Sequence, residues 1–195
     1  MAKRIGVNCI ILGICCLLSS AGLVVYNHRE EKNAEQAGEV LLLNVQQQMT
    51  EESADGSGAE EFEGEMLIAD VDRNPCIGVL SIPVLELELP VLTEWSYDKL
   101  RVAPCHYYGS YYDSDFVIAA HNYRSHFGRL SELQPKDLIL FTDVSGVVRC
   151  YEVVLLETLP ATATEEMITS GFDLSLYTCT QGGGSRVTVR CNRVN

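Results

Sequence analysis

Basic residues are scarce in this 195-residue sequence, which has 14 lysines and arginines against 27 aspartates and glutamates. They form no stripe of the kind that a nucleic-acid-binding surface needs, so we predict that nucleic acid is not a partner. The acidity is also uneven, because 13 acidic residues lie between Glu30 and Asp72, where Lys32 is the single basic residue. From Arg73 onward the chain is only mildly acidic.

The sequence also lacks paired metal-binding or redox motifs. It has eight cysteines but no Cys-x-x-Cys pair and no cysteine–histidine spacing of the zinc type, which argues against a structural zinc site and a thioredoxin-like centre. Five cysteines, an odd number, lie after residue 73, so at least one thiol there stays free unless it pairs between chains. These five are Cys76, Cys105, Cys150, Cys179 and Cys191.

A long uncharged run is present near the N-terminus. Residues 5–26 would form a helix of about 33 Å, enough to cross a hydrocarbon core of about 30 Å. Lys3 and Arg4, within residues 1–4, favour a cytoplasmic N-terminus. A cleavable signal peptide is the alternative, because "LLSSAG" contains small residues, but the length of the run favours a retained signal-anchor.

Residues 27–72 predict an acidic extracellular linker that acts as a tether. A helix is possible over 34–49, where "VLLLNV" forms a partial apolar face, and "TEESADGSGAEEFEGE" is typical of a disordered chain.

Short strand signals fill residues 73–195, whereas helical signals are few, at 97–102, around 127–133 and in "ATEEMIT". Strands are expected in "CIGVLSIPVLELELPVL", "DFVIAAH", "DLILFTDVSGVVRCYEVVLLETL", "LSLYTC" and "SRVTVRCNRV". Six to eight short strands with sparse helix predict a mainly β domain, a closed or nearly closed β-barrel.

One cysteine stands at the end of a predicted strand. Cys179 follows "LSLYT" and precedes the turn "TQGGGS", after which Arg186 opens the last strand. The arginine and the backbone amides of the turn are positioned to favour a thiolate. Arg190 shares a strand face with Arg186 but lies about 13 Å further along, so a solvated or salt-bridged role is expected for it. The alternative for Cys179 is a buried structural cysteine.

A histidine occupies a similar place on another strand. His121 ends "DFVIAAH", and a strand-end histidine together with a free thiol is the arrangement expected of a cysteine nucleophile and its base. His126 is the competitor, His106 is a weaker third candidate, and His28 lies in the tether.

These features together resemble the sortase family. "LYTCT", a short turn and "RVTVRCNRV" resemble the sortase strand that ends in cysteine, followed by an arginine that opens the final strand, and "VIAAHNY" resembles the strand that ends in the catalytic histidine. The resemblance covers about residues 76–194. It implies a closed barrel of about eight strands with Cys179 as nucleophile, His121 as acid/base and Arg186 as the oxyanion or substrate-orienting group.

The sequence departs from the family pattern at Ser175, often threonine, at Ala120, often glycine, and at Cys191, often glycine. These departures leave the chemistry in place and the subclass open. A class B insertion before Cys179 and a lid with an Asp-Pro-x motif are both missing, so an arrangement like class A, D or E is expected.

The resemblance also implies a reaction and partners. A sortase cleaves an LPxTG-like sorting signal between Thr and Gly and transfers the acyl product to an amine, which is a peptidoglycan cross-bridge precursor or a pilin lysine. The partners would be surface proteins or pilins that carry sorting signals. The enzyme would be a single-pass protein of a Gram-positive plasma membrane, with its N-terminus cytoplasmic and its catalytic domain extracellular.

Substrate contacts are expected beside the cysteine. Thr178 would contact substrate or assist the oxyanion, and Leu159, Pro160 and Ile168 would form the wall for the Leu-Pro of the signal. Glu165 and Glu166 resemble calcium ligands of some class A enzymes. A solvated acidic loop is favoured instead, because hard cations need several converging oxygens, so no cofactor or metal is predicted.

Two rival functions remain open. One is a non-enzymatic envelope domain in which Cys179 forms a structural disulfide with Cys150, Cys105 or Cys191, as an external compartment permits. The other is a cysteine peptidase that uses water instead of an amine.

Overall fold

The structure is a computed structural model that describes residues 2–54, 65–71 and 73–194. The chain forms two compact units, Met1–Asn33 and Ala34–Asn195. One helix, α1 (Ala2–Ala54), begins in the first unit and ends in the second. Within it, Ile10–Glu51 contains a segment with a mean hydropathy of 2.0 that is not buried, so α1 is a candidate membrane span by length and composition.

The end of α1 that belongs to the second unit includes residues 34–49, where the sequence allowed a helix with a partial apolar face. Ala34, Leu41 and Val45 are buried, and their spacing places them on one face of the helix. Leu41 and Val45 belong to an apolar cluster of the folded unit. The disorder expected for "TEESADGSGAEEFEGE" falls mainly on residues 55–64, which lie outside the described residues.

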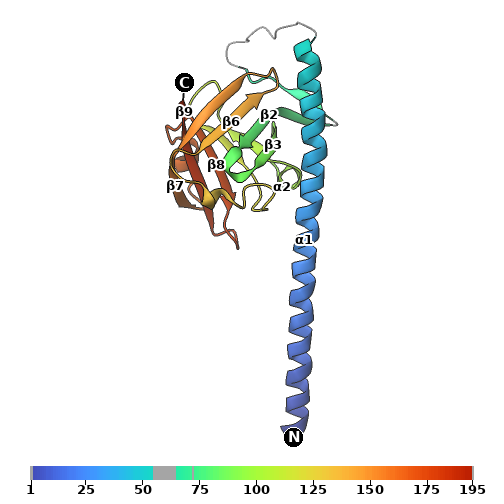
Figure 1. Ribbon diagram of the computed structural model, residues 1–195. Coiled ribbons are helices and arrows are strands. Elements are labelled where there is room, and N and C mark those ends of the chain that lie inside the picture. Colours follow the sequence, from blue (N-terminus) through green and yellow to red (C-terminus); the bar gives the residue numbers. More distant parts are fainter. Residues whose placement is uncertain (1, 55–64, 72, 195) are drawn as a thin grey trace. The chain divides into compact units, whose positions relative to one another are not determined.

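Among the described residues, nine strands follow, and eight of them close into a barrel (Figure 1). The order is β1-β2-β3-β4-β5-β8-β9-β7-β6, and pairing of β6 with β2 closes the ring, with β1 attached to β2. The predicted barrel of about eight strands with few helices is confirmed. The strands are β1 (Ala69–Val71), β2 (Asn74–Ile82), β3 (Leu87–Leu92), β4 (Cys105–Tyr108), β5 (Phe116–Ala119), β6 (Leu138–Asp143), β7 (Val148–Pro160), β8 (Leu174–Cys179) and β9 (Ser185–Val194).

Short helical segments connect the strands near the places where the sequence suggests them. They are η1 (Pro83–Leu85), α2 (Tyr97–Leu100), η2 (Leu130–Glu132) and α3 (Thr164–Ile168). Two strands, β1 and β4, lack a strong sequence signal, because each has only three or four residues and depends on pairing with its neighbours.

Successive residues of the strands pack into two different apolar clusters. In β5, Phe116 and Ile118 join the inner cluster, whereas Val117 and Ala119 join an outer cluster. The outer cluster also includes Tyr177 of β8 and buried residues of α1, α2 and α3. Full burial of one such large side chain contributes about 2 kcal/mol. The outer face of β5 and β8 is therefore covered by helices, and this packing holds the ends of the two strands in place.

Candidate active site

The three predicted catalytic residues lie at one edge of three neighbouring strands, with His121 two residues after β5, Cys179 at the end of β8 and Arg186 near the start of β9. β5 and β8 run parallel with Ala119 opposite Tyr177, and the Ala120 amide donates to the Tyr177 carbonyl at 3.1 Å. The same register places His121 beside Cys179. Cys179 in turn pairs with Arg186 across β8 and β9. Because adjacent strands lie about 4.8 Å apart, a histidine, a thiol and a guanidinium are side by side at one edge.

The turn between β8 and β9 brings the arginine back to the cysteine. Gly182 and Gly183 have φ values of 88° and 73°, a backbone region that side chains disfavour. Thr180 and Ser185 close the turn, since the Thr180 amide donates to the Ser185 carbonyl at 2.9 Å. The glycines therefore permit a tight reversal after Cys179.

Arg186 packs against an aromatic ring, and one of its guanidinium nitrogens is free to donate a hydrogen bond. Its guanidinium carbon lies 5.1 Å from the centre of the Tyr177 ring. Burial raises the pKa of the Tyr177 hydroxyl, so this ring is neutral and the contact is a cation–π interaction. The buried Nη1 of Arg186 has no hydrogen-bond partner in the described part of the chain. That atom is suited to an oxyanion beside Cys179.

The candidate histidines differ in environment. His121 is half-buried, and its ring lies 4.9 Å from that of Tyr123. His126 is 1% exposed, and burial, with the nearby His121 charge, lowers its pKa to about 4. The ring nitrogens of His106 lie near the backbone carbonyls of Thr93 and Gly109, a structural role. His121 is therefore the histidine that the strand register places beside the thiol.

The five cysteines of the barrel comprise three buried thiols, the half-buried Cys150 and one exposed thiol. All those described are free, and Cys179 is the exposed member of the five that follow residue 73. Burial raises the pKa of Cys76, Cys105 and Cys191 to about 12, which keeps these thiols protonated and inert. Cys191 lies in the inner cluster, five residues along β9 from the partner of Cys179, so about 16 Å separates the two positions along the strand.

The residues predicted to bind substrate surround this edge. Thr178 is buried, and its hydroxyl donates to the Ala120 carbonyl at 2.9 Å, which ties β8 to the end of β5. Leu159 pairs with Arg186 and belongs to the outer cluster, and Pro160 is the exposed last residue of β7. Ile168, at the end of α3, packs against the same cluster.

A hollow of about 210 Å³ is lined in part by Cys179. It includes Asn122 and Ser131, which sequence reasoning missed. Asn122 directly follows His121 and could have been found from that position, whereas Ser131 lies in η2 and has no sequence signal. The complete lining is Asn122, Phe127, Gly128, Ser131, Thr178, Cys179, Thr180, Gln181 and Val187.

Arg190 has a role that the sequence did not predict. It is buried, so the solvated alternative is wrong, while the salt bridge exists because Nε donates to Glu157 Oε1 at 2.8 Å. Nη1 donates to Ser175 Oγ at 2.8 Å. The same guanidinium donates to the carbonyls of Glu166 and Met167 in α3. Arg190 therefore fixes α3 to three strands of the barrel.

We expect replacement of Arg190 by methionine to lower the free energy of unfolding by about 2–3 kcal/mol, because buried carbonyls and Ser175 lose their donor. The loss is smaller than for a fully buried ion pair, because the Glu157 side chain is 31% exposed and is solvated by water once Arg190 is removed. Urea unfolding measures the loss, and amide exchange should accelerate over 164–169. Glu157→Gln, which keeps an oxygen acceptor for Nε, should cost less than about 1 kcal/mol. Equal stability of Arg190→Met and wild type would contradict this role.

The other end of the α3 loop is anchored by Asp115. One oxygen, Oδ1, accepts from the Ser170 amide at 2.7 Å, from the Ser170 hydroxyl at 2.8 Å and from the Gly171 amide at 2.9 Å. The loop that carries Ile168 is thus fixed on either side of that residue, by Arg190 before it and by Asp115 after it. Within the described residues, no three histidine, cysteine or acidic side chains converge as metal ligands, near Glu165 and Glu166 or elsewhere.

A closed barrel with a thiol, an imidazole and a guanidinium at adjacent strand ends has the arrangement of a cysteine-dependent acyltransferase. A family model described as "Sortase domain" matches residues 80–194, more than half of the chain. The chain belongs to the sortase family, whose members are cysteine transpeptidases.

Solved sortase structures share the fold. Sortase C1 from Streptococcus suis is 27% identical, with a TM-score of 0.54 over 62% of this chain and 73% of that one. Sortase C from Streptococcus pneumoniae is 21% identical, with a TM-score of 0.56 over 78% and 89%. Sortase A from Corynebacterium diphtheriae is 19% identical, with a TM-score of 0.57 over 84% and 95%. A search among curated proteins found no match.

Proposed function

We propose that this protein is a membrane-anchored sortase that cleaves an LPxTG-like sorting signal between Thr and Gly and transfers the acyl product to an amine. The observation that carries the proposal is the pairing of Cys179 with Arg186 across β8 and β9, together with the parallel β5–β8 register, which continued past the end of β5 brings His121 to the level of Cys179. The sortase family assignment supports the class of reaction.

In the first half of the reaction, the Cys179 thiolate attacks the carbonyl carbon of the signal threonine. Arg186 Nη1, which has no partner in the described residues, donates to the oxyanion that forms. The C–N bond then breaks, and protonated His121 gives its proton to the leaving glycine nitrogen. The products are a thioester on Cys179 and a free amine.

In the second half, an incoming amine attacks the thioester carbon and His121 accepts a proton from it. The C–S bond breaks, the thiolate returns, and a new amide is formed, so one amide replaces another without oxidation or reduction. The proposed acceptor is a peptidoglycan precursor or a pilin lysine, and the donor is a surface protein or pilin with a sorting signal. No cofactor takes part in this proposal.

The proposed substrate path follows the anchored α3 loop. Leu159, Pro160 and Ile168 are next to Arg186 or in that loop, where they are positioned to contact the Leu-Pro of the signal. The apolar part of α1 supports a retained single-pass anchor. We propose a cytoplasmic N-terminus and an extracellular barrel, which places the enzyme where both substrates meet.

The test is an incubation of the detergent-solubilised full chain with a quenched sorting-signal peptide, with and without triglycine. We expect cleavage that is several-fold faster with the amine, and a product whose mass equals the acyl fragment plus triglycine. Cleavage with only the hydrolysed product would instead support a peptidase. No cleavage across a panel of sorting motifs, with Cys179 found in a disulfide, would support the structural domain.

A further inference from the structure

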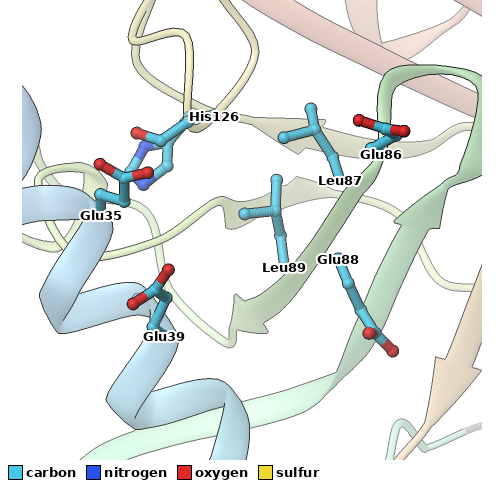
Figure 2. A pocket seen from close by; sticks show the side chains of 9 residues that line it. Glu35, Glu39, Glu86, Leu87, Glu88, Leu89 and His126 are labelled. Carbon is cyan, nitrogen blue, oxygen red and sulfur yellow. The ribbon is translucent and has the colours of Figure 1, made fainter.

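A second hollow, separate from the cysteine, lies between α1 and β3. Its volume is about 160 Å³, and Figure 2 shows Leu87 and Leu89 in its middle with glutamates at its sides. It lies wholly within the second compact unit, and we call it the acidic groove. Its lining is Glu35, Gly38, Glu39, Glu86, Leu87, Glu88, Leu89, Ser125 and His126.

The glutamates of the acidic groove are not equally engaged. Glu88 accepts a hydrogen bond from Gln46 at 3.0 Å. Glu86 lies close enough to Arg129 for its carboxylate to favour the charged form of the arginine. Glu35 and Glu39 are four apart on one face of α1, where like charges oppose helix formation. Neither has an ion-pair partner among the described residues. The helix therefore retains an uncompensated pair of charges toward the hollow.

The buried polar side chains of the acidic groove also lack well-formed hydrogen bonds. His126 is 1% exposed and lines the hollow together with Glu35 (Figure 2). The ring nitrogens of His126 and the buried hydroxyl oxygen of Ser125 make no hydrogen bond of good geometry in the described part of the chain. The Val102 backbone lies near enough to the ring to oppose the lowering of the His126 pKa, so it engages at most one of the two nitrogens. An unsatisfied buried polar group costs about 1–3 kcal/mol, so a free nitrogen of His126 favours a polar ligand in the hollow.

The chemistry of the lining selects the ligand. The low pKa of His126 leaves the ring neutral at physiological pH, so one nitrogen accepts a hydrogen bond. With the carboxylates, the acidic groove offers mainly acceptors around two leucines. A metal ion does not fit, because no three histidine, cysteine, aspartate or glutamate side chains converge as ligands in the described residues. An ammonium on an aliphatic stem fits both the apolar middle and the acidic sides.

The position of the acidic groove relates it to the amine half of the reaction. The Tyr123 ring lies 4.9 Å from the ring of His121 and 5.5 Å from that of His126, so it neighbours both the candidate base and the histidine of the acidic groove. The loop after β5 lines the acidic groove with Ser125 and the hollow beside Cys179 with Asn122. An amine that gives its proton to His121 must approach from the histidine side of the thiol.

We propose that the acidic groove binds a lysine-like cation carried by the amine substrate next to its reactive amine. This inference rests on the proposed transpeptidase function. The bound cation is not the attacking group; it holds the acceptor across the loop so that the free amine reaches the thioester beside His121. The preference is thus for acceptors that carry a second, cationic side chain.

Binding is tested without catalysis in the full chain with Cys179→Ala. The probe is Gly-Gly-Gly-Lys-amide, and the matched peptide carries norleucine, which keeps the stem and lacks the charge. We expect the lysine peptide to shift the ¹⁵N signals of the His126 ring, and binding to weaken with salt. Glu35→Gln/Glu39→Gln should weaken it about fivefold. The control Glu51→Gln, an exposed glutamate further along α1, should leave it unchanged.

Transfer is tested with the same peptides as acceptors for the active full chain. We expect a KM for the lysine peptide about fivefold below that for the norleucine peptide, and loss of this difference in the double variant with cleavage without amine unchanged. No shift at His126 would overturn the inference while the cleavage assay still stands. An effect of the double variant on cleavage would assign the acidic groove to the donor peptide, and so would also overturn it. Binding without any transfer would overturn the proposed function and with it the acceptor role.

Discussion

Replacement of Cys179 by alanine is expected to reduce cleavage of a sorting-signal peptide at least about a thousandfold. The thiol is exposed at the end of β8, with Arg186 opposite on β9 and His121 two residues after the end of the neighbouring strand β5. Without sulfur no thioester forms, and the oxyanion donor and the histidine have no covalent intermediate to act on. The measurement is the initial rate with the quenched peptide, together with the mass of the protein after incubation with substrate.

The matched control is Cys150→Ala. Cys150 is half-buried in β7, where it pairs with Leu140 and Val194, far along the sheet from the candidate site. We expect this variant to cleave at a rate within about twofold of wild type, because a half-buried side chain contributes packing and no chemistry. Cleavage that survives Cys179→Ala would contradict the assignment of the nucleophile.

Replacement of His121 by alanine is expected to lower the cleavage rate by about 10²–10⁴-fold, the usual contribution of a general acid–base group. His126→Ala should retain most of the cleavage activity. The structure gives the reason, because His126 is 1% exposed and its lowered pKa leaves it unprotonated, so it cannot supply a proton near neutral pH. The measurement is kcat/KM for the quenched peptide, with urea unfolding of each variant to separate activity from stability.

The pH profiles provide a second criterion for the same assignment. The limb of the pH profile that is lost in His121→Ala should persist in His126→Ala. Loss of the limb in His126→Ala, or a larger activity loss there than in His121→Ala, would contradict the assignment.

Where the local pattern was strong, the sequence was sufficient to predict the bounds of the strands. The expected strands "LSLYTC" and "SRVTVRCNRV" have the same bounds as β8 and β9, because their apolar alternation is bounded by a glycine turn. The closure of the barrel depends on pairing between β2 and β6, which are separated by more than 50 residues. Their apolar alternation indicated strands, but not which strand would become the partner of which.

Burial by distant segments could not be predicted. Arg190 has the periodicity of a strand-face residue, and only the folding of α3 over that face turns it into a buried anchor. The charged composition of residues 27–72 suggested a tether, whereas Leu41 and Val45 find an apolar surface made by other elements. Side-chain environment depends on which elements pack together, and composition does not contain that information.

The sequence by itself determined the class of fold, because strand alternation is a local property. The motifs around His121, Cys179 and Arg186 carried the resemblance to the sortase family. The tertiary structure decided that the parallel register of β5 and β8 brings two residues 58 positions apart to one edge. It also decided that His126 is buried beside the α1 glutamates. Both results depend on long-range pairing and packing, whose free energy appears only when distant segments meet.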